Sequence, residues 1–218
     1  MRSVLLILLA FLISCGSGKG PSHGDPASTK HMFGNSMFAF RNHAVQRVLK
    51  SKYEADFIDH SVIGAETEQI KMQWLNAIGS GETVKVAVID GGANDVLISL
   101  SCYVLDDDDD IGRECKNVIE DVADTFNSMI RNMIRGGVTK TIILVGSYHA
   151  IGLSKGFNKA VDYSYPLFKT ICKTPECILI DPRDAFNKDI FYWFDGSHPS
   201  EEGARLLAKL IMDKDMSP

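Results

Sequence analysis

Short β-branched segments alternate with amphipathic segments along most of this chain, and that alternation constrains the fold more than any other feature. Strands are expected at 30–33, 56–62, 83–89, 139–145 and 177–180. Helices are expected at 42–52, 66–78, 117–134, 160–172 and 200–212. Strands that alternate with helices form a mainly parallel sheet covered by helices on both faces. The pattern therefore predicts an α/β fold, a three-layer α/β/α sandwich around a five-stranded sheet.

Apolar spacing indicates which helix faces are buried. In the segment 66–78 we expect Ile70, Trp74, Leu75 and Ile78 to form the buried face. The segment 117–134 is the longest amphipathic stretch, with apolar residues recurring every three or four positions. The first expected strand, 30–33, is unusually polar, because it contains Lys30 and His31.

Length and composition describe an ordinary globular protein. The chain has 218 residues, of which 45% are hydrophobic and 23% charged, so a disordered chain is excluded. We expect one domain at 30–218. The formal net charge of −5 offers no basic surface for nucleic acid. The sequence contains no run of about 18 or more apolar residues, so an integral membrane protein is excluded. Oligomeric state cannot be read from these features.

The first residues are typical of an export signal. Arg2 precedes an apolar run that is too short to span a bilayer, so we interpret 1–14 as a signal peptide. The segment Leu12-Ile13-Ser14-Cys15 resembles a bacterial lipobox, which implies lipidation of Cys15; an ordinary secretory signal is the alternative. The Gly-, Ser- and Pro-rich residues 15–29 then form a flexible tether.

This interpretation predicts a lipoprotein of the bacterial cell envelope that faces the periplasm. The lipid anchor would be its only contact with a membrane. Gly16, rather than Asp, follows the lipidated cysteine, and by resemblance to lipoprotein sorting this favours the outer membrane.

The remaining cysteines agree with export. Cys102, Cys115, Cys172 and Cys177 form an even set, which suggests two disulfides in an oxidising compartment. Three pairings are possible, and we favour Cys102–Cys115 and Cys172–Cys177 because each closes a short local loop. Four free buried thiols are the alternative. No CxxC pair occurs, so neither a cysteine zinc site nor a thioredoxin-like redox pair is indicated.

Candidate catalytic residues follow the expected strands. Ser36 stands in Gly34-Asn35-Ser36, Gly64 follows the second strand, and Asn94 lies in Gly-Ala-Asn-Asp after the third. Asp195 precedes His198 by three residues, just before the last helix. Each motif alone also fits a helix cap or a turn. Because parallel sheets place ligands at the carboxyl ends of their strands, four such motifs in order point to one active-site rim.

Together these motifs resemble the SGNH, or GDSL-like, hydrolase family, from about His31 to Ile211. The resemblance implies a flavodoxin-like fold and a serine esterase. Ser36 would be the nucleophile, His198 the base, and Asp195 the residue that orients His198. The backbone amides of Ser36 and Gly64 and the Asn94 side chain would form the oxyanion hole. No metal ion or organic cofactor is implied.

The chain departs from the family pattern at one position. The family usually has Gly-Asp-Ser in the first motif, whereas here Asn35 replaces the aspartate. Asparagine keeps an acceptor oxygen but loses the charge, so the turn should survive. This exchange leaves a non-catalytic binding lipoprotein as an alternative. Among enzymes, short acyl or acetyl esters, some of them on glycans, are favoured substrates, with lysophospholipids and thioesters as alternatives.

Overall fold

The computed structural model describes residues 29–102, 110–136 and 141–215. The expected signal peptide, Cys15 and all of the tether but residue 29 lie outside these ranges. Within them, no helix is both long enough and apolar enough to cross a bilayer.

A parallel sheet forms the centre of the molecule. Its strands have the order β2-β1-β3-β4-β5, and every neighbouring pair is parallel. This is the doubly wound order of flavodoxin-like folds. The strands are β1 (Lys30–Phe33), β2 (Ile58–Asp59), β3 (Val86–Asp90), β4 (Thr141–Val145) and β5 (Cys177–Ile180).

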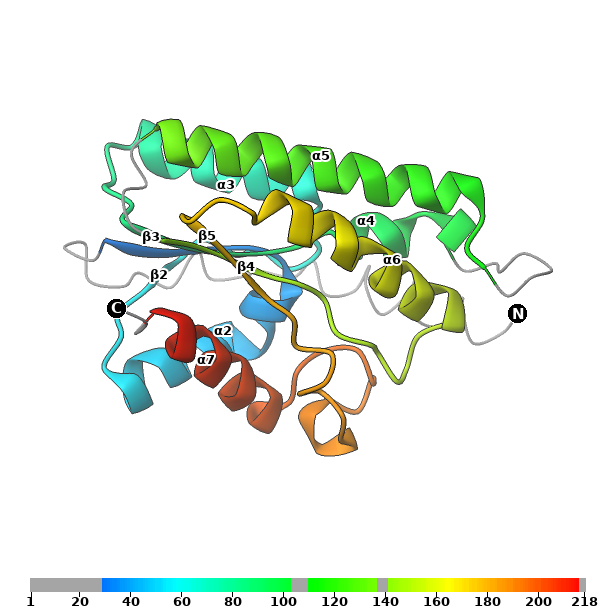
Figure 1. Ribbon diagram of the computed structural model, residues 1–218. Helices are drawn as coiled ribbons and strands as arrows, with labels where there is room; N and C mark the ends of the chain where they lie inside the picture. The colour runs from blue at the N-terminus through cyan, green and yellow to red at the C-terminus, as the bar shows by residue number, and fades with distance from the viewer. Residues whose placement is uncertain (1–28, 103–109, 137–140, 216–218) are drawn as a thin grey trace.

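Helices cover both faces of the sheet, so the predicted three-layer sandwich is confirmed (Figure 1). One face carries α2 (Ser36–Tyr53) and α7 (Glu201–Asp215), which pack against each other. The other face carries α3 (Thr67–Gly79), α4 (Ala93–Ile98), α5 (Arg113–Arg135) and α6 (Lys155–Ile171). Two short 3-10 helices, η1 (Leu100–Cys102) and η2 (Asp189–Phe191), complete the described elements.

The central strands are buried on both sides. Val88 and Ile143 pack into the core under α2 and α7, whereas Ile89 and Leu144 pack into the core under α3 and α5. All four side chains are fully buried. Both faces of β3 and β4 are thus covered, which explains why these strands are nearly continuous apolar runs in the sequence.

Three features differ from what the sequence predicts. The strand expected at 56–62 is only β2, because the Asp59 side chain accepts a hydrogen bond from the Ser61 amide and turns the chain away. Leu75 and Ile78 lie outward on α3, each 38% exposed; Ile70, Trp74 and Ala77 form its buried face. The short helix α4 was not expected from the sequence.

The helix expected at 42–52 is the second part of α2, which begins at Ser36 and bends sharply. Phe40 is extended, and Arg41, Asn42 and His43 have φ angles of 52°, 57° and 56°. Left-handed conformations cost about 1–2 kcal/mol per residue for side chains of this kind. Arg47 offsets part of that cost, because its guanidinium donates to the carbonyls of Arg41 and Asn42.

A buried carboxyl group supports the turn between β1 and α2. Asp90, the last residue of β3, accepts a hydrogen bond from the Asn35 amide at 2.8 Å through Oδ1. A β-carbon on Gly34 would lie 2.5 Å from that oxygen, so glycine is required there. From the other side, the Gln73 side chain accepts from the Gly34 amide and donates to its carbonyl. Burial raises the pKa of Asp90 to about 8, and the Asn35 hydrogen bond opposes that rise only partly.

This shifted pKa predicts a pH-dependent stability. The folded chain retains a proton on Asp90 that the unfolded chain releases near pH 4, so stability from this group is full below pH 4 and is lost as pH rises to about 8. Asp90→Asn mimics the protonated acid and should lack this loss. Thermal unfolding of both proteins between pH 4.5 and 9 measures this effect. The Tm of the variant should rise relative to the Tm of the wild type as pH rises. A difference in Tm that stays constant with pH would contradict the prediction.

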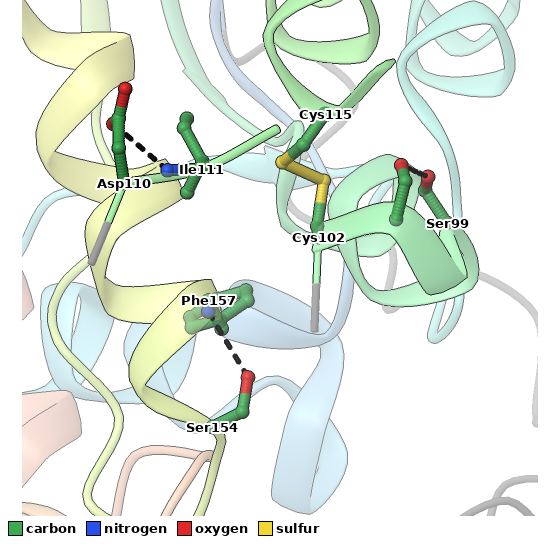
Figure 2. Close-up of a disulfide and its surroundings, with 8 residues drawn as sticks. Ser99, Cys102, Asp110, Ile111, Cys115, Ser154 and Phe157 are labelled. Atoms are coloured by element: carbon green, nitrogen blue, oxygen red, sulfur yellow. Dashed lines mark hydrogen bonds between the residues drawn. A yellow bond between two sulfur atoms is a disulfide. The ribbon is translucent and has the colours of Figure 1, made fainter. Parts of the chain in front are cut away.

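The two disulfides join Cys102 to Cys115 and Cys172 to Cys177, the pairing favoured by the sequence. The first ties η1 to the first turn of α5, beside Ile111 and Phe157 (Figure 2). These side chains belong to one apolar cluster between α4, α5 and α6. The second closes the connection between α6 and β5.

Loop length predicts that the two disulfides contribute unequally to stability. The cysteines are 13 positions apart in the first and 5 in the second. Chain entropy then gives about 3 kcal/mol for the first and about 2 kcal/mol for the second. Urea unfolding of Cys102→Ala/Cys115→Ala and Cys172→Ala/Cys177→Ala should show the larger loss in the former. The reverse order would refute this account.

Candidate active site

A small pocket lies at the carboxyl ends of the strands and brings three of the expected residues together. Ser36, Asn94 and His198 all line it, although they come from segments after β1, after β3 and before α7. Its volume is about 50 Å³, which is space for a few water-sized groups. Apolar side chains form most of the remaining wall: Met37, Leu97, Leu153 and Phe157.

Ser36 is the first residue of α2 and is 8% exposed. Asn35 precedes it as the N-cap, and its side-chain oxygen accepts a hydrogen bond from the Met37 amide at 2.9 Å. The expectation that asparagine would preserve this turn is met. Unpaired amides at a helix N-terminus favour negative charge, so the Ser36 hydroxyl lies where an oxyanion would be stabilised.

His198 is held by Asp195. The Nδ1 atom of the imidazole is 2.7 Å from Asp195 Oδ2, and Oδ1 of the same carboxylate accepts from the amides of Ser197 and His198 at 2.9 Å each. Partial burial alone would raise the pKa of Asp195, but the hydrogen bonds from His198 and from the backbone prevail and lower it to about 2. Asp195 is therefore ionised at neutral pH and fixes the ring through Nδ1.

The bend in α2 contacts the His198 loop. The Phe40 ring stacks on the imidazole, with 4.2 Å between ring centroids and 15° between ring planes. Arg41 lies over the Trp193 ring at 4.0 Å, and its Nε is 3.2 Å from Glu201 Oε1 at the start of α7. The left-handed residues thus place the Phe40 ring against one face of the His198 imidazole.

The loop after β4 supports the same histidine from the other side. Tyr148 lines the pocket and donates its hydroxyl to the Ser197 carbonyl at 2.8 Å. The Gly152 amide donates to the Gly196 carbonyl at 3.0 Å. Gly196 has a φ of 69°, and a β-carbon there would lie 2.5 Å from the Gly152 nitrogen. Only glycine therefore fits where the backbone at 196 approaches the backbone at 152.

Asn94 is 4% exposed and donates one amide hydrogen to the Ala65 carbonyl at 2.9 Å. Its NH₂ group carries a second hydrogen that can serve a ligand. Gly64 is not among the residues that line the pocket; it lies in the loop that Asn94 holds through Ala65, with a φ of 81°. The structure therefore brings Ser36, Asn94 and His198 to one pocket and does not bring Gly64 to its lining.

The pocket lining contains one imidazole, that of His198, and no carboxylate or thiol, so it is not built as a metal site. Elsewhere in the described chain, His31, His60 and Glu82 place their ligand atoms within 4.8 Å of one another. None of these three residues lines the pocket.

Several supporting residues were not found from the sequence. Gln73, Asp90 and Tyr148 act through contacts with segments far away in the sequence. The one available signal was Asp90 itself, because a carboxylate that ends a continuous apolar strand is buried and needs a partner. Phe40 gave no signal, since a left-handed bend without glycine is not readable from composition.

Solved structures with the same fold include esterases and lipases. The chain is similar to Axe2, an acetylxylan esterase from Geobacillus stearothermophilus (15% identity, TM-score 0.66, 93% of this chain and 98% of that one). It is also similar to a lipase/acylhydrolase from Enterococcus faecalis (22%, 0.58, 84% and 93%). A third match is the lipase Lip_vut3 from a goat rumen metagenome (17%, 0.63, 84% and 95%). No curated protein sequence matches the chain.

Sequence comparison with protein families gives a match over most of the chain. Residues 28–206 match the GDSL-like lipase/acylhydrolase family. The matched segment includes Ser36 at the start of α2, Asn94 in α4, and the Asp195–His198 loop. The chain therefore belongs to the GDSL-like lipase/acylhydrolase family and is a hydrolase that acts on ester bonds.

Proposed function

We propose that the protein is a serine esterase in which Ser36, His198 and Asp195 form the catalytic triad. The observation that carries this proposal is the pocket itself, since Ser36 and His198 line it together and Asp195 holds the far nitrogen of the imidazole. Catalytic mutants of the structural neighbour Axe2 are at a serine, an aspartate and a histidine. The last two are three positions apart, as Asp195 and His198 are here.

The proposed reaction has two steps. The Ser36 hydroxyl attacks the ester carbonyl carbon while His198 Nε2 takes its proton, and the same proton then passes to the departing alcohol. Water, activated by His198, next attacks the acyl-enzyme and releases the carboxylic acid. Asp195 remains ionised and stabilises the imidazolium in both steps.

The oxyanion hole would consist of the Ser36 amide, the Asn94 side chain and the Gly64 amide. Ser36 offers an amide in the first turn of α2, and the free hydrogen of Asn94 lies in the pocket wall. Removing one such donor lowers turnover by roughly 100- to 1,000-fold in comparable sites. Gly64 fits the role because its loop rests on Asn94 through Ala65.

The pocket size favours short acyl groups. Its volume of about 50 Å³ is small, which favours acetyl over an extended chain. The structural likeness to an acetylxylan esterase agrees with this size, so we propose acetyl or other short acyl esters, including those on glycans. A lipid substrate is the second candidate, because Leu100, Ile151 and Phe194 are 72%, 58% and 90% exposed in the segments after β3, after β4 and before α7.

We also propose that the enzyme is exported as a lipoprotein anchored through Cys15. The lipobox-like segment carries this proposal. The two disulfides support export, because such bonds persist in oxidising compartments.

Ser36→Ala tests the nucleophile. The variant is expected to lower kcat for p-nitrophenyl acetate by at least about 10⁴-fold, because the attacking oxygen is lost. It should also abolish covalent labelling by a fluorophosphonate probe. Ser147→Ala is the matched control, since this serine also lines the pocket but lies after β4, and it should still be labelled. Labelling that persists in Ser36→Ala, or a folded wild type that is never labelled, would reject the triad.

A series of p-nitrophenyl esters tests the acyl preference. We expect kcat/KM to be highest for acetyl and propionyl esters and to fall steadily toward octanoyl, because a longer chain must leave the pocket. The Phe194→Ser variant should leave the acetyl rate unchanged if the exposed apolar residues take no part. A maximum at long chains that Phe194→Ser abolishes would favour the lipid substrate.

A further inference from the structure

A second group of polar side chains lies within the sheet region, outside the proposed active site. His31 lies in β1, His60 immediately follows β2, and Glu82 lies in the connection between α3 and β3. His31 Nδ1 is 3.0 Å from His60 Nε2, and Glu82 Oε2 is 3.3 Å and 3.4 Å from these two nitrogens. Three potential ligand atoms therefore form one nearly equilateral triangle.

The size of this triangle fits a bound metal ion. Zinc binds imidazole nitrogen and carboxylate oxygen at about 2.0–2.2 Å, so two ligands of a tetrahedral site lie about 3.3–3.5 Å apart. Two of the three observed separations fall in this range, and the third is slightly shorter. We propose that His31, His60 and Glu82 bind one divalent first-row transition-metal ion, with Zn²⁺ as the ion that suits the donor set best.

The hydrogen bonds within the cluster leave one oxygen of the Glu82 carboxylate without a donor. Glu82 Oε2 is buried and has no hydrogen-bond partner in the described chain, although two ring nitrogens lie within 3.4 Å of it. A buried carboxylate oxygen without a donor is strongly unfavourable. A cation at the centre of the triangle removes this cost because it attracts all three atoms at once.

The two imidazoles are held rigidly. Their rings are parallel within 2°, and the Phe33 ring stacks on that of His60 with 5.0 Å between centroids. Trp74 packs edge-on against Phe33 and fixes the stack from α3. Such preorganisation lowers the cost of ordering the ligands when an ion binds.

Exposure increases across the cluster in a way that allows ion entry. The His31 side chain is fully buried, that of His60 is 14% exposed, and that of Glu82 is 32% exposed. An ion can enter from the Glu82 side and keep a water molecule as its fourth ligand. Two imidazoles, one carboxylate and a water form a known zinc ligand set, whereas Ca²⁺ and Mg²⁺ prefer oxygen ligands alone.

The bound ion would link three separate segments. β2 has only two residues and pairs only with β1, so few backbone hydrogen bonds hold this edge of the sheet. A metal bridge from His60 to His31 and Glu82 ties the edge to β1 and to the approach to β3. It would stabilise the folded chain without touching the pocket, so it is independent of the proposed esterase activity.

The experiment uses the full chain, freed of metal with EDTA and then titrated with Zn²⁺. Calorimetry should show one ion bound per chain, and Tm should rise by about 5–10 °C at a hundredfold excess of Zn²⁺ over Kd. Co²⁺ should give the intense visible absorption of a tetrahedral site. A wild-type protein that takes up neither ion would overturn the proposal.

Glu82→Gln is the decisive variant, because it keeps the side-chain size and removes the anionic ligand. We expect Zn²⁺ binding more than about 100-fold weaker and no rise in Tm. His149→Gln is the matched control: this histidine is 42% exposed and contacts Asp162, and its loss should leave Zn²⁺ binding unchanged. Circular dichroism in EDTA confirms that each variant is folded. Binding of equal strength in Glu82→Gln and wild type would reject the site, as would weakening by His149→Gln alone.

Discussion

The hydrogen bond between buried Asp90 and the Asn35 amide is the contact on which the arrangement of the pocket depends. It joins the end of β3 to the turn that begins α2, and Gln73 holds the same turn from α3. Asp95 then accepts from both the amide and the hydroxyl of Thr67, which joins the first turns of α4 and α3. Hydrogen bonds between separate elements therefore help to keep Ser36 and Asn94 at one site.

These contacts explain how the chain accommodates asparagine at position 35, where the family usually has aspartate. Asn35 keeps the helix cap through its side-chain oxygen, while the acidic group of this region lies one strand away, at Asp90. Asp90 is largely protonated at neutral pH, and an ionised carboxylate at position 35 would repel it as soon as it lost its proton. An amide at position 35 avoids that repulsion and leaves Asp90 as the acceptor for the backbone.

The sequence predicted the architecture well because apolar periodicity reports directly on burial. β5 has the expected bounds, and the alternation of strands and helices gives the correct layers. Turns after strands carry strong local signals, and three of the residues predicted from them, Ser36, Asn94 and His198, line one pocket. Contacts between distant segments were not predictable: the left-handed bend at Arg41 brings Phe40 onto His198. The polar residues of strand 30–33 have partners that are distant in the sequence: Lys30 pairs with Asp215, and His31 contacts His60.

The shortness of the sheet edges affects how the folded protein behaves in concentrated solution. β2 offers only two residues at one edge, and β5, with four residues, begins at a disulfide-linked cysteine at the other. Intermolecular strand addition needs a long row of unpaired amides and carbonyls as a template. Neither edge provides one, so the central sheet can be strongly apolar without inviting self-association.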